Sequence, residues 1–201
     1  MNISTTVHPK LQHFGLVTSK LDAMIDWYRK VLGMTVNHRS ESLPGPRRSP
    51  WLSSAFLSND EVNHRIAMFE MADVEVDASK NRHARVQHFA FEYETLDDLL
   101  GTYVRLKDMG ILPVLVADQG VQMVFYYSDP DQNTVELNIG NFGNEWTATE
   151  FIKASASVMA FVDPEKMILA RKSGASPWDL HERAVAGEFA PARPYDGRAL
   201  L

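Results

Sequence analysis

The sequence predicts an α+β protein made of two copies of one strand–helix–strand–strand–strand unit, followed by a helical extension. The first observation is a repeat, because Gln12-His13-Phe14 returns 75 residues later as Gln87-His88-Phe89. At the same offset Leu21-Asp22 returns as Leu96-Asp97. The second observation is that each copy places an amphipathic helix directly after its first strand. Internal repeats outrank local motifs as a guide to architecture, so the two copies set the expected fold.

The first copy begins with a strand over Lys10–Val17, which mixes apolar residues with His13. A helical face follows, with Gly33 as its stop, and its apolar members recur at helical spacing: Met24, Ile25, Tyr28, Val31 and Leu32. Three further strands are expected over Met34–His38, Trp51–Leu57 and Asn63–Glu70. The proline-rich stretch Leu43–Pro50 is expected to be a loop.

The second copy repeats that order after a polar link over Asp77–Ala84. A strand over Val86–Tyr93 precedes a helix that begins near Leu96 and ends at Gly110. The three remaining strands are expected over Leu112–Ala117, Gln122–Tyr127 and Asn133–Ile139. The paired units therefore fill residues 1–140, approximately as 8–72 and 84–140.

Residues 141–201 have a different character and predict a helical C-terminal extension. Helices are expected over Glu145–Phe161, Pro164–Lys172 and Pro177–Glu188, with Asp163 and Ser176 as N-caps of the last two. The stretch Pro191–Arg198 is expected to be extended. No chemistry is predicted in this segment, which we expect to pack on the domain or on a second subunit.

Composition limits the classes of function. A net charge of −6 and a pI near 5.6 argue against nucleic acid or an anionic membrane as partner. The absence of cysteine excludes disulfides, thiolate metal sites and cysteine nucleophiles. No apolar run approaches the ~20 residues of a membrane span, and the N-terminal stretch does not resemble a signal peptide. A cytoplasmic enzyme or binding protein is expected.

The repeated histidines predict a metal site. Glu136 lies between Val135 and Leu137, and a carboxylate among apolar neighbours needs a cation or donors. His13 and His88 are its natural companions, since two neutral imidazoles and one carboxylate suit Fe(II) and leave positions open. The remaining histidines outside the motifs have nothing to pair with and are expected to be packed or surface residues: His8, His38, His83 and His181.

Strand alternation assigns further side chains to common faces. On one strand the expected face carries His64, Ile66, Met68 and Glu70, and on another it carries Gln122, Val124 and Tyr126.

Three stretches, Gln12–Met34, Gln87–Phe91 and Val124–Leu137, resemble the vicinal oxygen chelate superfamily. The resemblance covers about residues 10–140 and leaves the extension outside it. It implies two βαβββ modules that form a half-open mixed β-barrel around a metal site.

Within that superfamily the pattern is most similar to one-domain type I extradiol ring-cleaving dioxygenases. The resemblance implies His13, His88 and Glu136 as metal ligands, Tyr126 as a hydrogen-bonding residue near the substrate and His64 as an acid–base catalyst. It further implies Fe(II) as the metal, with Mn²⁺, Ni²⁺ or Zn²⁺ as alternatives. A catechol-type diol and O₂ would be the substrates, and a ring-opened semialdehyde the product.

One departure from that family concerns oxygen chemistry. Two-domain members carry another histidine nine residues before the tyrosine, where this chain has Ala117 followed by Asp118 and Gln119. That histidine helps to bind the oxygen intermediate, so the details of oxygen activation are expected to differ.

Two other functions stay open at this point. Glu70 in Phe69-Glu70-Met71 resembles Glu136 in Val135-Glu136-Leu137, and a fourth ligand at Glu70 would suit a glyoxalase-like isomerase or lyase that uses Ni²⁺, Zn²⁺ or Co²⁺. A non-catalytic small-molecule binding protein is the third reading. For each of the three a homo-oligomer is expected, and the exact substrate is not specified by the motifs.

Overall fold

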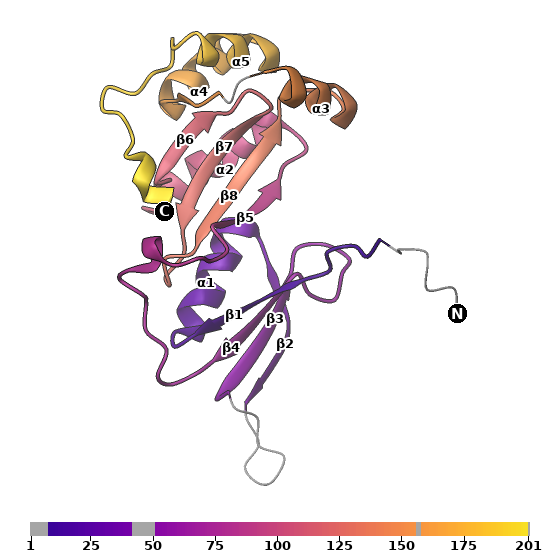
Figure 1. The fold of residues 1–201 in the computed structure, drawn as a ribbon, viewed down its shortest axis with the longest axis vertical. Helices are drawn as coiled ribbons and strands as arrows, with labels where there is room; N and C mark the ends of the chain where they lie inside the picture. The colour runs from indigo at the N-terminus through magenta and orange to yellow at the C-terminus, as the bar shows by residue number, and fades with distance from the viewer. Residues whose placement is uncertain (1–7, 42–50, 156–157, 201) are drawn as a thin grey trace. The chain divides into compact units, whose positions relative to one another are not determined.

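A computed structural model describes residues 8–41, 51–155 and 158–200 (Figure 1). The chain divides into two compact units, Met1–Val76 and Asp77–Leu201. The loop expected over Leu43–Pro50 lies outside the described residues. Within the described ranges, none of the helices has the length and apolar character that a membrane span requires.

The first unit holds one helix and a four-stranded mixed sheet. Its elements are β1 (Phe14–Thr18), α1 (Leu21–Leu32), β2 (Thr35–Glu41), β3 (Ser53–Ser58) and β4 (Ile66–Glu70). The strand order is β1-β4-β3-β2, with β1 parallel to β4 and the other pairs antiparallel (Figure 1). This is the element order that the sequence predicts.

Helix α1 covers one face of this sheet. Its apolar spacing buries one stripe of side chains, Leu21, Met24, Ile25, Trp27, Tyr28 and Val31, and the helix contacts β3 and β4. Ile66 and Met68 on β4 are fully buried. Gly33 ends the helix as expected, because its φ of 64° is left-handed and its amide donates to the Arg29 carbonyl.

The second unit repeats the arrangement in a five-stranded sheet. After a short 3₁₀ turn, η1 (Lys80–Arg82), its elements are β5 (His88–Glu92), α2 (Leu96–Asp108), β6 (Leu115–Asp118), β7 (Gln122–Ser128) and β8 (Thr134–Gly140). The strand order is β5-β8-β7-β6-β9, with β5 parallel to β8. The α+β class and the repeated strand order expected from the sequence are confirmed.

The extension belongs to the second unit and is only partly helical. It contains α3 (Glu145–Ala154), β9 (Ala160–Phe161), α4 (Pro164–Lys172), α5 (Pro177–Val185) and η2 (Gly197–Leu200). The helix expected over Glu145–Phe161 is too long, because Ala160 and Phe161 instead pair with Asp118 and Ala117 at the edge of the sheet. An uncovered edge strand exposes unpaired backbone groups, and β9 gives β6 its second partner.

The expected N-caps of the last two helices are present. The Asp163 carboxylate accepts from the Glu165 amide at 3.0 Å, and the Ser176 hydroxyl accepts from the Asp179 amide at 3.1 Å. Asp179 in turn accepts from the Ser176 amide at 3.0 Å, which completes a capping box.

A buried polar cluster fastens α5 to the sheet. His181 Nδ1 lies 2.8 Å from Asp118 Oδ2, and the two residues are 8% and 0% exposed. Asp118 also accepts from the Gly120 amide at 2.7 Å and from Asn141 Nδ2 at 3.1 Å. His181 is a packed residue, as expected, but the reason given for it is wrong, since it has a partner 63 residues away in the sequence.

We predict that His181→Leu destabilises the second unit. Removing a hydrogen bond to a buried charged group costs about 1.5–3 kcal/mol of unfolding free energy, and urea unfolding would measure the loss. His83→Leu is the matched control, because His83 pairs with the exposed Asp77 and should leave the midpoint unchanged. Equal midpoints for the two variants would contradict the anchoring role of His181.

Candidate metal centre

One face of the second sheet carries the residues that the sequence singles out. Strand register places Ala90 of β5 and Tyr126 of β7 directly opposite Glu136 of β8, one on each side. Neighbours in register point to the same face of a sheet, and so do alternate residues along each strand. We call this face, which carries His88, Glu136 and Tyr126, the site face.

Glu136 is a buried carboxylate with a full set of partners. It is 1% exposed. Its Oε1 accepts from Asn138 Nδ2 at 2.7 Å and from Gln122 Nε2 at 2.9 Å. Its Oε2 lies 3.2 Å from His88 Nε2. These donors offset the cost of removing a charge from water, and they hold the second oxygen toward the histidine.

The orientation of His88 leaves a lone pair facing that oxygen. His88 Nδ1 contacts the side-chain oxygen of Gln87, which can only accept a hydrogen bond. The proton of a neutral His88 therefore lies on Nδ1, and Nε2 carries the lone pair. A lone pair and a carboxylate oxygen then face each other at 3.2 Å. Positive charge relieves the repulsion between two acceptors at this separation, whether it comes from a second ring proton or from a bound metal ion.

The donor set fits a divalent metal. Ligand nitrogens and oxygens bind such metals at about 2.0–2.2 Å, so two ligands at a right angle lie about 3 Å apart. The 3.2 Å between His88 Nε2 and Glu136 Oε2 matches that separation. A neutral imidazole and a carboxylate are also the ligand types that Fe(II) takes in proteins.

Tyr126 joins this centre through its hydroxyl group. Burial, and then a hydrogen bond to Glu136, raise the pKa of Tyr126 above its usual value, so the phenol keeps its proton. Gln119 Nε2 donates to the phenol oxygen at 3.1 Å. Gln122 Nε2 lies 3.4 Å from Gln119 Oε1, which closes a ring of hydrogen bonds through Glu136.

This ring of hydrogen bonds bears on position 117, where two-domain dioxygenases carry a histidine and this chain has Ala117. Ala117 is buried in the same cluster as Val124 and Tyr126, where its methyl group offers no hydrogen bond. Asp118 points to the opposite face and binds His181. Gln119 instead supplies the donor next to Tyr126. Sequence reasoning missed this role of Gln119 because the residue follows the strand, where alternation gives no guide.

The first unit repeats the histidine arrangement. His13 Nδ1 contacts the side-chain oxygen of Gln12, as His88 does with Gln87, so its Nε2 also carries the lone pair. Gln12 Nε2 lies 3.4 Å from both Asn63 Oδ1 and the His64 carbonyl. The repeated Gln-His pair thus has a common effect, because a hydrogen bond on one ring nitrogen leaves the lone pair on the other, as it does in histidines that bind metals.

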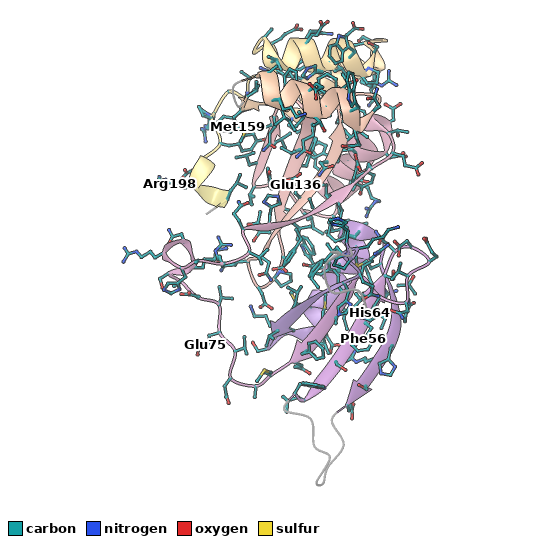
Figure 2. The ribbon with its side chains drawn as sticks, turned by 45° about the vertical axis from the view of Figure 1, so that its right-hand side comes forward. Phe56, His64, Glu75, Glu136, Met159 and Arg198 are labelled. Carbon is teal, nitrogen blue, oxygen red and sulfur yellow. The ribbon has the colours of Figure 1, made fainter. Side chains whose placement is uncertain are left out.

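His64 lies beside His13. Their ring centroids are 4.3 Å apart, and the His64 ring stacks on Phe56 at 4.8 Å (Figure 2). Burial, and then the neighbouring His13, lower the pKa of His64, which favours its neutral form.

His64 does not share a face with the buried Ile66 and Met68, contrary to expectation. Strand β4 begins only at Ile66, so alternation does not extend back to residue 64. Phe56 pairs with Ala67, whose side chain points away from the face of Ile66 and Met68. The stacked His64 ring therefore lies on the face of Ala67.

Glu70 is not the counterpart of Glu136. Gly15 and Ala90 are equivalent at the 75-residue offset, and in the parallel pairs Gly15 faces Ala67 whereas Ala90 faces Glu136. The equivalent of Glu136 is therefore Ala67. Glu70 pairs with Thr18 at the far end of β1 and accepts a hydrogen bond from Ser53. The local resemblance of the two Glu tripeptides misaligned the copies by three residues.

The predicted residues thus form two groups. The first unit brings His13 and His64 together, and the second brings His88, Glu136 and Tyr126 together. Among the described residues, neither unit holds by itself a cluster of three or more His, Asp and Glu side chains suited to a metal ion. The set His13, His88 and Glu136 draws on both units and stays a prediction.

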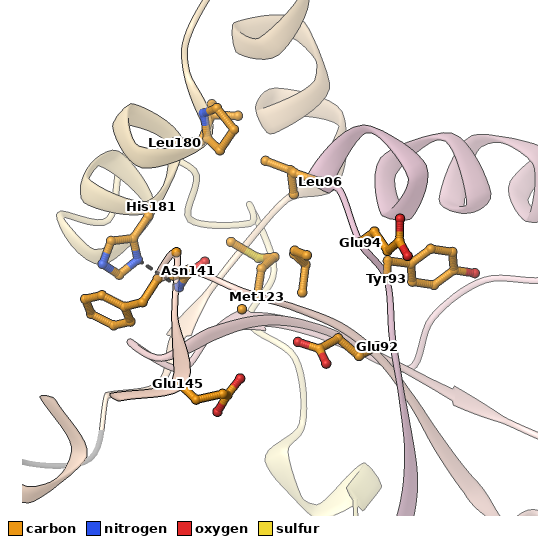
Figure 3. Close-up of a pocket in the computed structure, with 14 residues that line it drawn as sticks. Glu92, Tyr93, Glu94, Leu96, Met123, Asn141, Glu145, Leu180 and His181 are labelled. Atoms are coloured by element: carbon orange, nitrogen blue, oxygen red, sulfur yellow. Dashed lines mark hydrogen bonds between the residues drawn. The ribbon is translucent and has the colours of Figure 1, made fainter. Parts of the chain in front are cut away.

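A pocket of about 580 Å³ lies elsewhere in the second unit (Figure 3). Its lining includes Met123 and Ile139, which point to the face opposite Tyr126 and Glu136. His181 and Leu180 of α5 and Leu96 of α2 line it as well. This pocket is separate from the site face.

Known proteins resemble this chain in sequence and in fold. The model of the Glyoxalase/Bleomycin resistance protein/Dioxygenase superfamily matches residues 10–137. Biphenyl-2,3-diol 1,2-dioxygenase 3 of Rhodococcus globerulus is 33% identical over 90% of this chain and 92% of its own length. Biphenyl-2,3-diol 1,2-dioxygenase 2 of the same organism is 36% identical over 73% of this chain and 71% of its own length.

A solved glyoxylase/bleomycin resistance protein/dioxygenase domain from Frankia sp. EAN1pec shares the fold. Its TM-score is 0.56 at 19% identity, over 67% of this chain and 99% of that domain. The family match covers both repeats and both histidine motifs. The chain therefore belongs to the Glyoxalase/Bleomycin resistance protein/Dioxygenase superfamily.

Proposed function

We propose that this protein is an extradiol ring-cleaving dioxygenase that opens a catechol-type aromatic diol with O₂ at a mononuclear Fe(II). The proposed ligands are His13, His88 and Glu136. The observation that carries the proposal is the pair of acceptors on the site face, His88 Nε2 and Glu136 Oε2 at 3.2 Å, with a protonated phenol beside them. A metal ion held by these two acceptors would lie next to a phenol that can donate a proton.

The two Rhodococcus relatives support an aromatic diol as substrate. Both are biphenyl-2,3-diol 1,2-dioxygenases, and one aligns over nine-tenths of this chain. Biphenyl-2,3-diol is therefore the first substrate to test. We also expect a cytoplasmic homo-oligomer.

The chain's own residues would orient the diol and move its protons. Bound Fe(II) would supply the electronic chemistry that joins the diol to O₂, with both reactants held in one place. Tyr126, whose phenol keeps its proton, would turn its single O–H from Glu136 to a substrate oxygen when the diol binds. His64, a neutral imidazole stacked on Phe56, would accept a proton from the diol.

The isomerase alternative loses its fourth ligand. It needs a carboxylate in the first unit at the position equivalent to Glu136, and that position is Ala67. Alternation also turns Glu70 to the face opposite Ala67, since the two lie three residues apart in a regular strand. Three protein ligands leave positions free for diol and O₂.

Protein prepared without oxygen and loaded with Fe(II) should convert biphenyl-2,3-diol into a yellow ring-opened semialdehyde. Absorbance in the visible range and O₂ uptake would measure the turnover. Removal of the metal with a chelator should abolish it, and added Fe(II) should restore it. Absence of colour with a broad catechol panel, together with Ni²⁺-dependent turnover of a hemithioacetal, would refute the proposal.

The substitutions Glu136→Gln and Glu70→Gln should separate the two carboxylates. Loss of Glu136 removes a ligand, so Fe(II) affinity should fall by more than the roughly 10- to 100-fold typical of residues one step further from a metal. Glu70→Gln should leave affinity within about twofold, because Glu70 bonds to Ser53. Equilibrium dialysis under nitrogen measures both, and equal losses would restore the four-ligand alternative.

Replacing Tyr126 by Phe should lower kcat by roughly 10²- to 10³-fold, the usual cost of losing a donor aimed at reacting charge. Tyr127→Phe is the matched control. Tyr127 is the next residue of β7, on the opposite face, and its buried hydroxyl has no partner among the described residues. Steady-state kinetics should show an unchanged Tyr127→Phe enzyme. A similar loss in both variants would mean that the substitution acts through packing.

A further inference from the structure

A long-range hydrogen bond connects the C-terminal segment to the histidine of the site face. Gln87 Nε2 donates to the Leu200 carbonyl at 2.6 Å, across 113 residues of sequence. The other end of the same amide accepts from His88 Nδ1. An amide group held at both ends cannot turn over and exchange its oxygen for its nitrogen. The Leu200 carbonyl thus fixes which end of Gln87 faces His88.

Among the described residues, Gln12, the glutamine related to Gln87 by the repeat, has no such contact with the C-terminal segment. Gln12 makes the same contact with His13, but its amide nitrogen lies near Asn63 and His64 of its own unit at 3.4 Å. In the second unit the C-terminal segment supplies the acceptor, at a shorter distance. Two equivalent ligands therefore have two different anchors.

The same segment covers the site face beside Tyr126. Tyr195 and Leu200 pack against an apolar cluster made of Leu115, Ala117, Val124 and Tyr126. The Tyr195 ring also meets Phe161 edge-on, with centroids 6.0 Å apart. The Tyr126 ring in turn meets the His88 ring edge-on at 5.6 Å. Contacts therefore run from the C-terminal segment to His88 along two routes.

We propose that residues 195–200, the tail segment, are a positioning element of the metal centre. The tail segment holds Gln87 so that His88 keeps its proton on Nδ1 and presents Nε2, and it forms an apolar wall beside Tyr126. This inference rests on the proposed function for its purpose. Its two readouts below, a tautomer and a metal affinity, require no turnover.

The test combines a chain that ends after Asp196 with Gln87→Leu, each made separately and together. The first readout is the ¹⁵N spectrum of the histidine rings in metal-free protein at about pH 8.5, where imidazoles are neutral. The His88 signal is assigned by its disappearance in His88→Gln. The second readout is Fe(II) affinity by equilibrium dialysis under nitrogen.

The native chain should show a single His88 tautomer with the proton on Nδ1. The shortened chain should show a mixture of tautomers and an Fe(II) affinity lower by about tenfold or more, the range for partners that orient a ligand. Gln87→Leu should do the same. Both changes remove the same hydrogen bond, between Gln87 and Leu200. The combined variant should therefore lose no more Fe(II) affinity than the more severe of the two single variants.

Gln12→Leu is the control for that coupling. Its amide bonds within the first unit, so its effect on affinity should multiply with that of the shortened chain. Full-length Leu200→Ser removes the apolar contact and should shift affinity in the same direction. If circular dichroism shows that the shortened chain does not fold, the full-length variant Gln87→Leu decides the test, because it removes the hydrogen bond itself.

Two results would overturn the inference. One is a folded shortened chain, or Gln87→Leu, with the native tautomer and an Fe(II) affinity within twofold of the native value. The other is a combined variant whose losses multiply. If no diol is cleaved by the native chain while both readouts shift as expected, the proposed reaction fails and the positioning role stands.

Discussion

The buried carboxylate of Glu136 is the constraint on which the second sheet depends. A charge that is 1% exposed needs donors, and each donor comes from a different place. Asn138 follows on the same strand, Gln122 comes from the neighbouring strand, and Tyr126 lies directly opposite. Satisfying one oxygen with amides leaves the other free to face His88. The polarity of the site face follows from this one requirement.

The two copies of the repeat share the same strand order but differ in the polar side chains that the strands carry. Where the second copy places Glu136 opposite Tyr126, the first copy places Ala67 opposite Phe56. The carboxylate and the phenol hydroxyl have no equivalents there, and the aromatic ring that remains stacks on His64. What both copies retain is the Gln-His pair, in which the glutamine oxygen contacts Nδ1 of the histidine. The asymmetry lies in side chains, since the strand order is common to both.

Most of the fold follows from the sequence because repeats and periodicity act locally. The helices begin at Leu21 and Leu96, which are related by the 75-residue offset, and Gly33 ends the first as expected. Pairings between distant segments carry no local pattern, so β9 and the bond between His181 and Asp118 were missed. For the same reason the resemblance of the two tripeptides points wrongly to Glu70 as the counterpart of Glu136. Only strand register shows that Ala67 holds that position.

The sequence likewise predicts some residues of the candidate site and not others. The repeat and the apolar neighbours of Glu136 predict His88 beside Glu136, the family resemblance adds Tyr126, and the contacts among them lie within one sheet. The amides that hold them, Gln87, Gln119 and Asn138, were missed because glutamine and asparagine carry no charge that demands an explanation in a sequence. Their role appears only when each donor and acceptor in the buried network is assigned.

The Gln87–Leu200 hydrogen bond also bears on the order in which the protein is made. Synthesis runs from the N-terminus, and the glutamine of the first unit finds its neighbours once residue 64 has been added. The glutamine of the second unit waits for residue 200. Until residue 200 has been added, His88 and Glu136 are present without the hydrogen bond that holds the Gln87 amide. The orientation of the His88 imidazole is therefore settled later in synthesis than that of His13, although the two lie in the same repeated motif.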